Sequence, residues 1–263
     1  YNLSEKERAF QRNQAFLGME LVPGTRRLAL MNCLLHGMEG DDEGVVHVGN
    51  TLGSAGSGLP RSHIILSNPP FGTAKGGGGP TRDDLTFATS NKQLAFLQHI
   101  VGHLRDGGRA AVVLPDNVLF EGGAGEKIRR KLLETCDVHT ILRLPTGIFY
   151  AQGVKANVVF FDNAPKDGRV HTEGVWFYDL RTNQHFTLKT RPLGEADLQD
   201  FITCYPPENR HQRVATERFR YFRYDELVAR DKASLDLFWL KDESLDSLDD
   251  LPPPAVLQQE IIE

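Results

Sequence analysis

Short apolar runs alternate with segments of helical periodicity along most of this chain. This alternation constrains the fold more than any other feature, because strands connected through helices run parallel in one sheet that is covered by helices. We therefore expect a doubly wound α/β fold. The last two runs are joined by a connection without helical periodicity, so they are expected to pair antiparallel. The expected strands are residues 15–20, 45–48, 63–66, 109–115, 138–144 and 157–161, and the expected helices are residues 23–36, 91–104 and 126–136.

The pattern changes beyond Asn163, where the sequence becomes polar and is broken by proline clusters. A chain of 263 residues is long enough for one large α/β domain with an appendage. We therefore divide it into a core of residues 1–163 and a small α+β appendage of residues 164–263. Within the appendage, residues 176–180 and 185–189 are expected to form a hairpin, and a helical tail follows.

Composition limits the setting in which the chain works. The net charge of −5 argues against tight, autonomous DNA binding, which needs clustered Lys and Arg. The three cysteines form no C-x-x-C pair, which indicates a reducing compartment and no structural zinc. No apolar run approaches membrane-spanning length, and no signal peptide is apparent. The first residues read as the inside of a protein, with a helix capped at Ser4 and Glu7, so the chain is expected to be part of a longer one.

One apolar run, residues 63–66, stops at the sequence Ser67-Asn68-Pro69-Pro70-Phe71-Gly72. Each proline fixes φ and gives up its N–H, so the loop presents carbonyl acceptors with little competing donor chemistry. Asn68 adds a side-chain acceptor and Phe71 adds a flat apolar face. Two acceptors and a stacking platform suit a planar substrate with an exocyclic amine. An ordinary exit from a strand into a loop explains these few residues equally well.

This loop resembles the catalytic loop, D/N/S-P-P-Y/F/W, of amino-methyltransferases that use S-adenosylmethionine, and its phenylalanine is most similar to the DNA adenine-N6 enzymes. A longer resemblance is to the modification subunit of type I restriction-modification systems. It covers residues 15–162 and returns at 224–240. The segments that carry it are residues 18–20, 27–32, 35–37, 49–52, 68–72, 89–93, 96–99, 107–115 and 144–149.

The resemblance implies the Rossmann-like methyltransferase sheet, mostly parallel with an antiparallel last strand. It departs from the family in two places. The glycine-rich cofactor loop, D-P-x-C-G-T-G-G, is absent and is expected upstream of Tyr1, so the sheet is expected to lack its first strand. Asn50 stands where the family usually has aspartate, which keeps one acceptor and loses the charge.

The resemblance also implies the site. Glu20 ends a strand in the position of an acid that bonds ribose hydroxyls, with a surface carboxylate as the alternative. Asn50 is the candidate for the cofactor's adenine, and an ordinary turn residue after a strand explains it equally well. Thr51 and Leu52 belong to the same cofactor-binding loop, although Leu52 is equally suited to the core. The implied catalytic residues are Asn68, Pro69, Pro70 and Phe71. No metal is expected.

The leading hypothesis is therefore the core of an N6-adenine DNA methyltransferase subunit, which transfers a methyl group from S-adenosylmethionine to a flipped adenine in duplex DNA. The implied partners are a specificity subunit and a restriction subunit, in the cytoplasm of a bacterium or archaeon. A non-catalytic assembly or DNA-binding subunit is one alternative, motivated by the missing cofactor loop. A protein or RNA methyltransferase is the other.

Two further groups of residues carry chemistry without a clear role. His99 and His103 lie four residues apart on an expected helix but lack the glutamate of H-E-x-x-H and a third ligand, so we interpret them as structural. Residues 210–223 interleave arginines with aromatic side chains, which suits nucleic acid or a half-buried hairpin equally.

Overall fold

The computed structural model describes residues 2–72, 82–150, 153–206, 209 and 212–241. The chain forms two compact units, and each is described by itself. One unit comprises residues 1–62 and 70–105, and the other comprises residues 63–69 and 106–263. None of the helices in the described part of the chain is long and apolar enough to cross a membrane.

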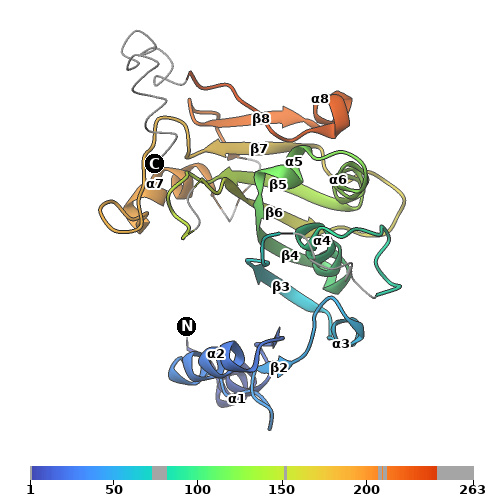
Figure 1. The fold of residues 1–263 in the computed structure, drawn as a ribbon, viewed down its shortest axis with the longest axis vertical. Helices are drawn as coiled ribbons and strands as arrows, with labels where there is room; N and C mark the ends of the chain where they lie inside the picture. Colours follow the sequence, from blue (N-terminus) through green and yellow to red (C-terminus); the bar gives the residue numbers. More distant parts are fainter. Residues whose placement is uncertain (1, 73–81, 151–152, 207–208, 210–211, 242–263) are drawn as a thin grey trace, which may run out of the picture. The chain divides into compact units, whose positions relative to one another are not determined.

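The described residues of the first unit form a small parallel sheet and four helices (Figure 1). The two strands pair in register from Gly18 with Val46 to Glu20 with Val48. The capping box predicted at the first helix is present, because the Ser4 hydroxyl accepts a hydrogen bond from the Glu7 N–H and the Glu7 carboxylate accepts one from the Ser4 N–H. The elements are α1 (Glu5–Asn13), β1 (Gly18–Glu20), α2 (Pro23–Leu35), β2 (Val46–Val48), α3 (Ser54–Ser57) and α4 (Lys92–His103).

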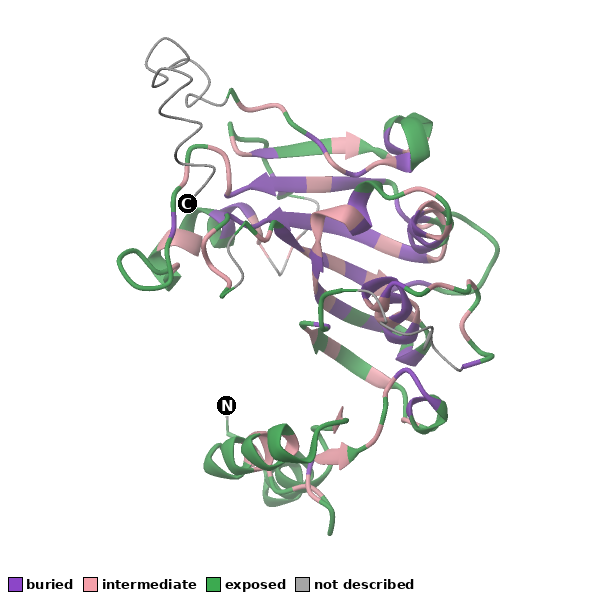
Figure 2. Cartoon of the chain, viewed as in Figure 1, coloured by how far each residue is buried: buried purple, intermediate pink, exposed green. Residues whose placement is uncertain are grey.

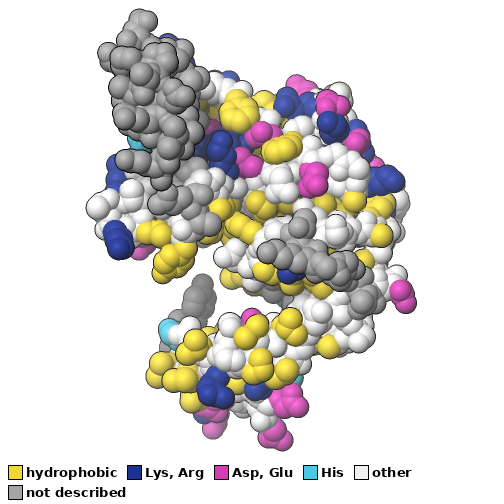
Figure 3. Space-filling model, in the orientation of Figure 1, with side chains coloured by type: hydrophobic (Ala, Val, Ile, Leu, Met, Phe, Trp, Pro, Cys, Tyr) yellow, Lys and Arg dark blue, Asp and Glu magenta, His cyan; other side chains and the backbone are white. Residues whose placement is uncertain are grey.

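Helix α2 forms where the sequence predicts it, but its apolar face is not covered. The sequence spacing of its leucines and methionine predicts one buried face. In the structure, α2 contains no buried residue, and Figure 3 shows hydrophobic side chains exposed over this part of the molecule. Helical periodicity identifies which side of a helix is apolar, but not which element packs on it. The exposed side chains on this face are Leu28, Met31, Leu34 and Leu35.

The second unit is built on a six-stranded sheet in the order β3-β4-β6-β5-β7-β8. Strand β6 runs antiparallel to both β4 and β5, as predicted for the last two strands of the core. Strand β5 is parallel to β7, and β7 is antiparallel to β8. The elements are β3 (Ser62–Ser67), β4 (Leu104–Pro115), α5 (Asp116–Phe120), α6 (Ala124–Thr135), β5 (Cys136–Arg143), β6 (Ala156–Asn163), β7 (Gly174–Asp179), α7 (Glu195–Cys204), β8 (Phe219–Arg223) and α8 (Tyr224–Ala229), followed by a 3₁₀ turn at Asp231–Ala233.

The core of this unit follows its central strands (Figure 2). Burial is nearly continuous along β5 and β7, as expected for strands covered on both faces, and alternates along β4 and β6, as expected where one face is covered more than the other. The α/β class and the Rossmann-like order of antiparallel β6 between β4 and β5 agree with the predicted methyltransferase sheet. The described strands form two separate sheets, whereas a complete sheet of this class would be continuous.

The predicted hairpin beyond Asn163 is wrong. Residues 185–189 contain no strand, and β7 pairs instead with β8, which follows helix α7 along the chain. A turn does form after β7, with Asn183 at φ 58°, but the chain then continues into α7. Strands β7 and β8 extend the same sheet as β5, so the division at Asn163 does not coincide with an edge of this sheet. The division into a core and an appendage stays a prediction. The helical tail beyond residue 241 lies outside the described residues.

Candidate active site

The carboxyl ends of β1 and β2 bring Glu20 and the Asn50 loop together. In a parallel pair both strands end at the same edge, and here the Gly49 N–H donates to the Glu20 carbonyl oxygen at 3.1 Å. The Glu20 Oε1 accepts a hydrogen bond from the Val22 N–H at 2.7 Å. Among the described residues, no hydrogen bond engages the other carboxylate oxygen. Glu20 is therefore oriented by its own backbone and still has an acceptor to offer.

The loop after β2 is tightly folded around Asn50. The Asn50 Oδ1 accepts from the Leu52 N–H at 3.0 Å, which closes an Asx turn. Asn50 itself is exposed, whereas Leu52 is only 8% exposed. Gly56 faces this turn so closely that a Cβ atom there would lie 1.9 Å from the Thr51 carbonyl oxygen. Leu52 is therefore a core residue, which was one of its two interpretations, and Asn50 is the member of the loop that faces solvent.

Arg82 links this loop to helix α4, a role that the sequence did not predict. Its buried guanidinium donates to the Thr51 carbonyl oxygen at 3.0 Å and pairs with Asp84. The same nitrogen that reaches Thr51 lies 2.6 Å from the His99 Nδ1. Burial lowers the pKa of His99 to about 3, so its neutral ring accepts this bond. The arginine follows a glycine-rich segment and carries no periodic signal, so the pattern did not mark it.

His99 and His103 have the partners of structural residues. His103 Nδ1 lies 2.9 Å from the His99 carbonyl oxygen, one turn earlier in α4, and the two rings are 4.1 Å apart. Both side chains are buried. No group of three or more His, Cys, Asp or Glu side chains in the described ranges is arranged to hold a metal ion.

The proline loop follows β3 as the sequence predicts. The strand ends at Ser67, and Asn68 and Pro70 are exposed while Pro69 is buried. Within the described part of the chain, the Asn68 side-chain amide has no hydrogen-bond partner. Phe71 is 37% exposed, so part of its ring is accessible. The loop passes from the second unit to the first between Pro69 and Pro70.

The end of this loop is anchored on helix α4. The Gly72 carbonyl oxygen accepts from the Lys92 N–H at 3.3 Å, in the first turn of the helix, where backbone N–H groups lack partners within the helix. The Asn91 side chain caps the same helix by accepting from the Leu94 N–H at 3.2 Å. The structure therefore assembles the four predicted cofactor residues in one unit and holds Phe71 through the neighbouring Gly72. The roles of the eight predicted site residues stay predictions.

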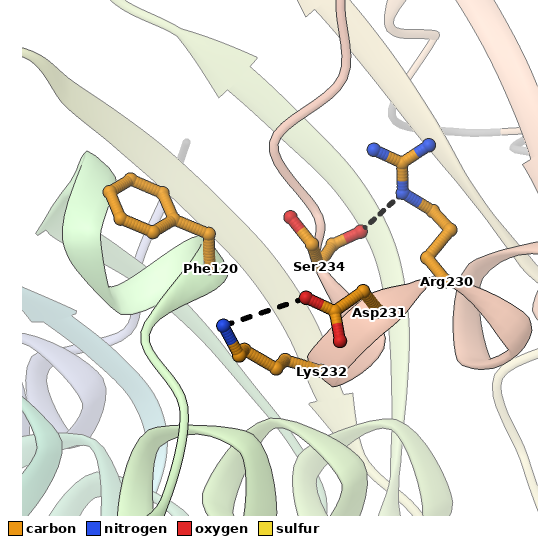
Figure 4. A pocket seen from close by; sticks show the side chains of 5 residues that line it. All are labelled: Phe120, Arg230, Asp231, Lys232 and Ser234. Atoms are coloured by element: carbon orange, nitrogen blue, oxygen red, sulfur yellow. Dashed lines mark hydrogen bonds and ion pairs between the residues drawn. The ribbon is translucent and has the colours of Figure 1, made fainter.

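A cavity in the second unit involves none of these residues. Figure 4 shows its wall, in which Lys232 pairs with Asp231 at 3.5 Å and Arg230 donates to the Ser234 carbonyl oxygen at 2.8 Å. The ring of Phe120 lies across from them.

The arginine-rich segment 210–223 is described in part. Residues 219–223 form the edge strand β8, and residues 210 and 211 lie outside the described residues.

Comparison with known proteins identifies the family. The model of the family N-6 DNA Methylase matches residues 2–232. Over 95% of its length the chain is 50% identical to the StySJI type I restriction enzyme methylase subunit of Salmonella typhimurium and 48% identical to the EcoKI methylase subunit of Escherichia coli. It covers 54% of each, so the chain spans about half the length of these curated relatives.

Solved structures agree with this assignment. The crystal structure of the EcoKI M protein matches with a TM-score of 0.84 and 42% identity, over 100% of this chain and 66% of that one. The modification subunit of a putative type I restriction enzyme from Vibrio vulnificus matches with a TM-score of 0.70 and 25% identity, over 88% of this chain and 48% of that one. The family model matches most of the chain, the relatives are about 50% identical, and the fold is shared. This chain therefore belongs to the N-6 DNA methylase family.

Proposed function

We propose that this chain is the core of the modification subunit of a type I restriction-modification system, which methylates the N6 nitrogen of adenine in duplex DNA. The observation that carries the proposal is the Asn68-Pro69-Pro70-Phe71 loop at the end of β3, whose amide has no hydrogen-bond partner among the described residues and whose aromatic ring is partly accessible, in a chain of this family. The names of the relatives, type I restriction enzyme methylase subunits, support the same assignment.

The residues at the edge of β1 and β2 fit S-adenosylmethionine. The carboxylate of Glu20 keeps one oxygen for the ribose hydroxyls, and Asn50 is exposed with a second lone pair on its Oδ1 for the adenine amine. When bound, S-adenosylmethionine supplies an electrophilic methyl group on a sulfonium. Thr51, which Arg82 holds through its carbonyl oxygen, shapes the loop that carries Asn50.

The proline loop supplies the chemistry at the target amine. The lone pair of adenine N6 is delocalised into the ring and is a poor nucleophile. Hydrogen bonds from the amine to the Asn68 Oδ1 and the Pro69 carbonyl oxygen favour a tetrahedral nitrogen, which localises that lone pair. Such fixed dipoles stabilise the transition state, and positioning contributes the rest. Phe71 stacks on the base after it leaves the helix, and Pro70 stiffens the loop between them.

Methylation of DNA is tested directly with the full-length chain. We expect purified subunit, combined with its specificity subunit, to transfer tritium from methyl-labelled S-adenosylmethionine to duplex DNA, and nucleoside analysis to find N6-methyladenine. No transfer to any nucleic acid or protein would indicate a non-catalytic assembly subunit. Transfer to RNA or to protein glutamine instead of DNA would identify the other class of methyltransferase.

The division of labour between subunits gives a second expectation. These 263 residues carry a net charge of −5 and are not rich in clustered Lys and Arg, so we expect the full-length subunit alone to bind duplex DNA weakly and without sequence preference. Adding the specificity subunit should produce tight, site-specific binding, and the restriction subunit should join this complex. Gel shifts over a salt series measure both states. Nanomolar, sequence-specific binding by the subunit alone would contradict the proposal that another chain reads the sequence.

Phe71 provides a test of base stacking. Phe71→Trp should retain activity, since another aromatic face can stack on a flipped base. Phe71→Ala should lose about 1–3 kcal/mol of stabilisation, the usual worth of one stacked base. Steady-state methylation with the assembled complex measures the difference in kcat/KM. Equal rates for the alanine and tryptophan variants would show that the ring packs within the protein and does not stack on substrate.

A further inference from the structure

Gln93 holds the residue that follows the catalytic loop. Its side chain is 3% exposed and lies in the first turn of α4. In the amide orientation that satisfies every donor and acceptor, the oxygen accepts from the Gly72 N–H. The nitrogen donates to the Gly72 carbonyl oxygen at 3.3 Å and to the Asn91 Oδ1 at 2.5 Å. One side chain thus engages both backbone polar groups of Gly72, as a neighbouring strand would.

Gly72 has an unusual backbone conformation, which the hydrogen bonds from Gln93 help to maintain. Its φ of 116° lies in the region that side-chain-bearing residues rarely adopt. A Cβ atom at this position would meet nothing within 4 Å, so conformation rather than space is what calls for glycine here. The Lys92 N–H also donates to the Gly72 carbonyl oxygen, which gives this peptide three bonds to the start of α4.

A second glutamine on the same helix provides a comparison. Gln98 accepts from the Phe87 N–H at 2.8 Å and donates to the Phe87 carbonyl oxygen at 2.9 Å. Gln93 and Gln98 therefore make the same two-point bond to a backbone residue from one rigid helix. They differ in what they hold, because Gly72 adjoins Phe71 in sequence and Phe87 lies well beyond the proline loop.

We propose that Gln93 is a positioning residue that fixes the direction of Phe71 for base stacking, an inference that rests on the proposed function. With Gly72 bonded at both its N–H and its carbonyl, the peptide that joins Phe71 to Gly72 cannot rotate without breaking these bonds and leaving the buried amide of Gln93 without partners. Phe71, Gly72 and Gln93 belong to the same unit of the structure, so this link lies within one unit.

Kinetics of the assembled complex test the proposal. Misplacing a reacting group by about 1 Å lowers rates by about 10²-fold. Because Gln93 acts through Phe71, Gln93→Ala should lower kcat by up to the loss expected for Phe71→Ala, about 5- to 10²-fold, while the KM for S-adenosylmethionine stays near the wild-type value. Gln98→Ala removes an equivalent pair of bonds and should retain most of kcat. Equal losses in the two variants, or a loss confined to KM, would overturn the role of Gln93.

Gly72→Ala reaches the same peptide without opening a space in α4. It should also lower kcat with little change in KM, because only φ is disturbed. This variant tests the proposal if Gln93→Ala does not fold. Wild-type kcat in Gly72→Ala would overturn it.

A spectroscopic readout separates this proposal from the proposed reaction. A 4-fluorophenylalanine placed at position 71 of the full-length chain should give one sharp ¹⁹F resonance. The resonance should broaden or split in Gln93→Ala and stay sharp in Gln98→Ala, whether or not the protein methylates DNA. An unchanged resonance in Gln93→Ala would refute positioning, whereas absent methylation with the expected spectra would refute only the reaction.

Discussion

Asn68→Ala in the assembled complex is expected to lower the rate of methyl transfer by about 10²–10³-fold, the usual loss when one preorganised polar group is removed from a transition state. The affinity for S-adenosylmethionine should change little, because the cofactor is expected at Glu20 and Asn50. In the structure the Asn68 amide has no partner among the described residues, so it is available to the target amine. A tritiated-methyl assay measures the rate, and calorimetry measures the affinity.

Two further variants separate the proposed role of Asn68 in methyl transfer from the proposed role of Asn50 in cofactor binding. Asn68→Asp keeps acceptor oxygens at the same place and should retain measurable activity, because aspartate occurs in the related loops. Asn50→Ala should weaken cofactor binding while the rate at saturating cofactor changes less. Near-normal turnover by Asn68→Ala would rule out its role as acceptor for the target amine.

The sequence predicted the parts of the fold that depend on local pattern. The six strands from β1 to β6 and the helices α2, α4 and α6 appear near the positions that apolar periodicity predicted, because each is one continuous amphipathic or apolar segment. The grouping of Glu20 with Asn50 was also accessible, since parallel neighbours end at one edge of a sheet. The antiparallel β6 followed from the short connection that precedes it.

Long-range pairing was not accessible in the same way. Nothing local distinguishes a strand that pairs with its next neighbour from one that pairs with β8, so β7 was assigned the wrong partner. The short helix α5 and the later helix α7 were missed for lack of a long periodic pattern. The exposed apolar face of α2 was also not predicted, because the spacing of apolar residues does not show which element packs on them.

Buried polar residues were the least visible from the sequence. Gln93, Arg82 and Arg129 received no role from the sequence as individual residues, yet each is nearly inaccessible and bonded to backbone. Arg129 donates to the carbonyl oxygens of Lys232 at 2.6 Å and Ala233 at 3.3 Å, about a hundred positions away. Burial lowers the pKa of Arg129 to about 10, which still leaves it charged near neutral pH. Such partners depend on tertiary structure and leave no periodic signal.

Arg143 is another buried arginine bonded to backbone, and we expect it to contribute strongly to the free energy of unfolding of the second unit. Arg143 is fully buried at the end of β5, where it donates to the Leu237 carbonyl oxygen and pairs with Asp236. Its guanidinium also lies 3.9 Å from an Asp116 carboxylate oxygen and 5.0 Å from the Phe238 ring centre. It therefore fastens the segment after the 3₁₀ turn to the sheet, in a position with little access to water.

Arg143→Ala is expected to lower the free energy of unfolding by about 3 kcal/mol, the lower end of the usual loss when a buried ion pair is broken, because Asp116 and Asp236 still have Arg181 beside them. Arg143→Lys keeps the charge but not the planar fork that reaches Asp236 and Leu237 together, so it should recover only part of the loss. Arg169 supplies the matched control, because its ion pair with Asp167 is on the surface, with the arginine side chain 82% exposed. Arg169→Ala should change stability by at most about 1 kcal/mol. Urea denaturation of the full-length chain, followed by circular dichroism, measures all three, and similar midpoints for Arg143→Ala and Arg169→Ala would show that Arg143 does not hold the sheet.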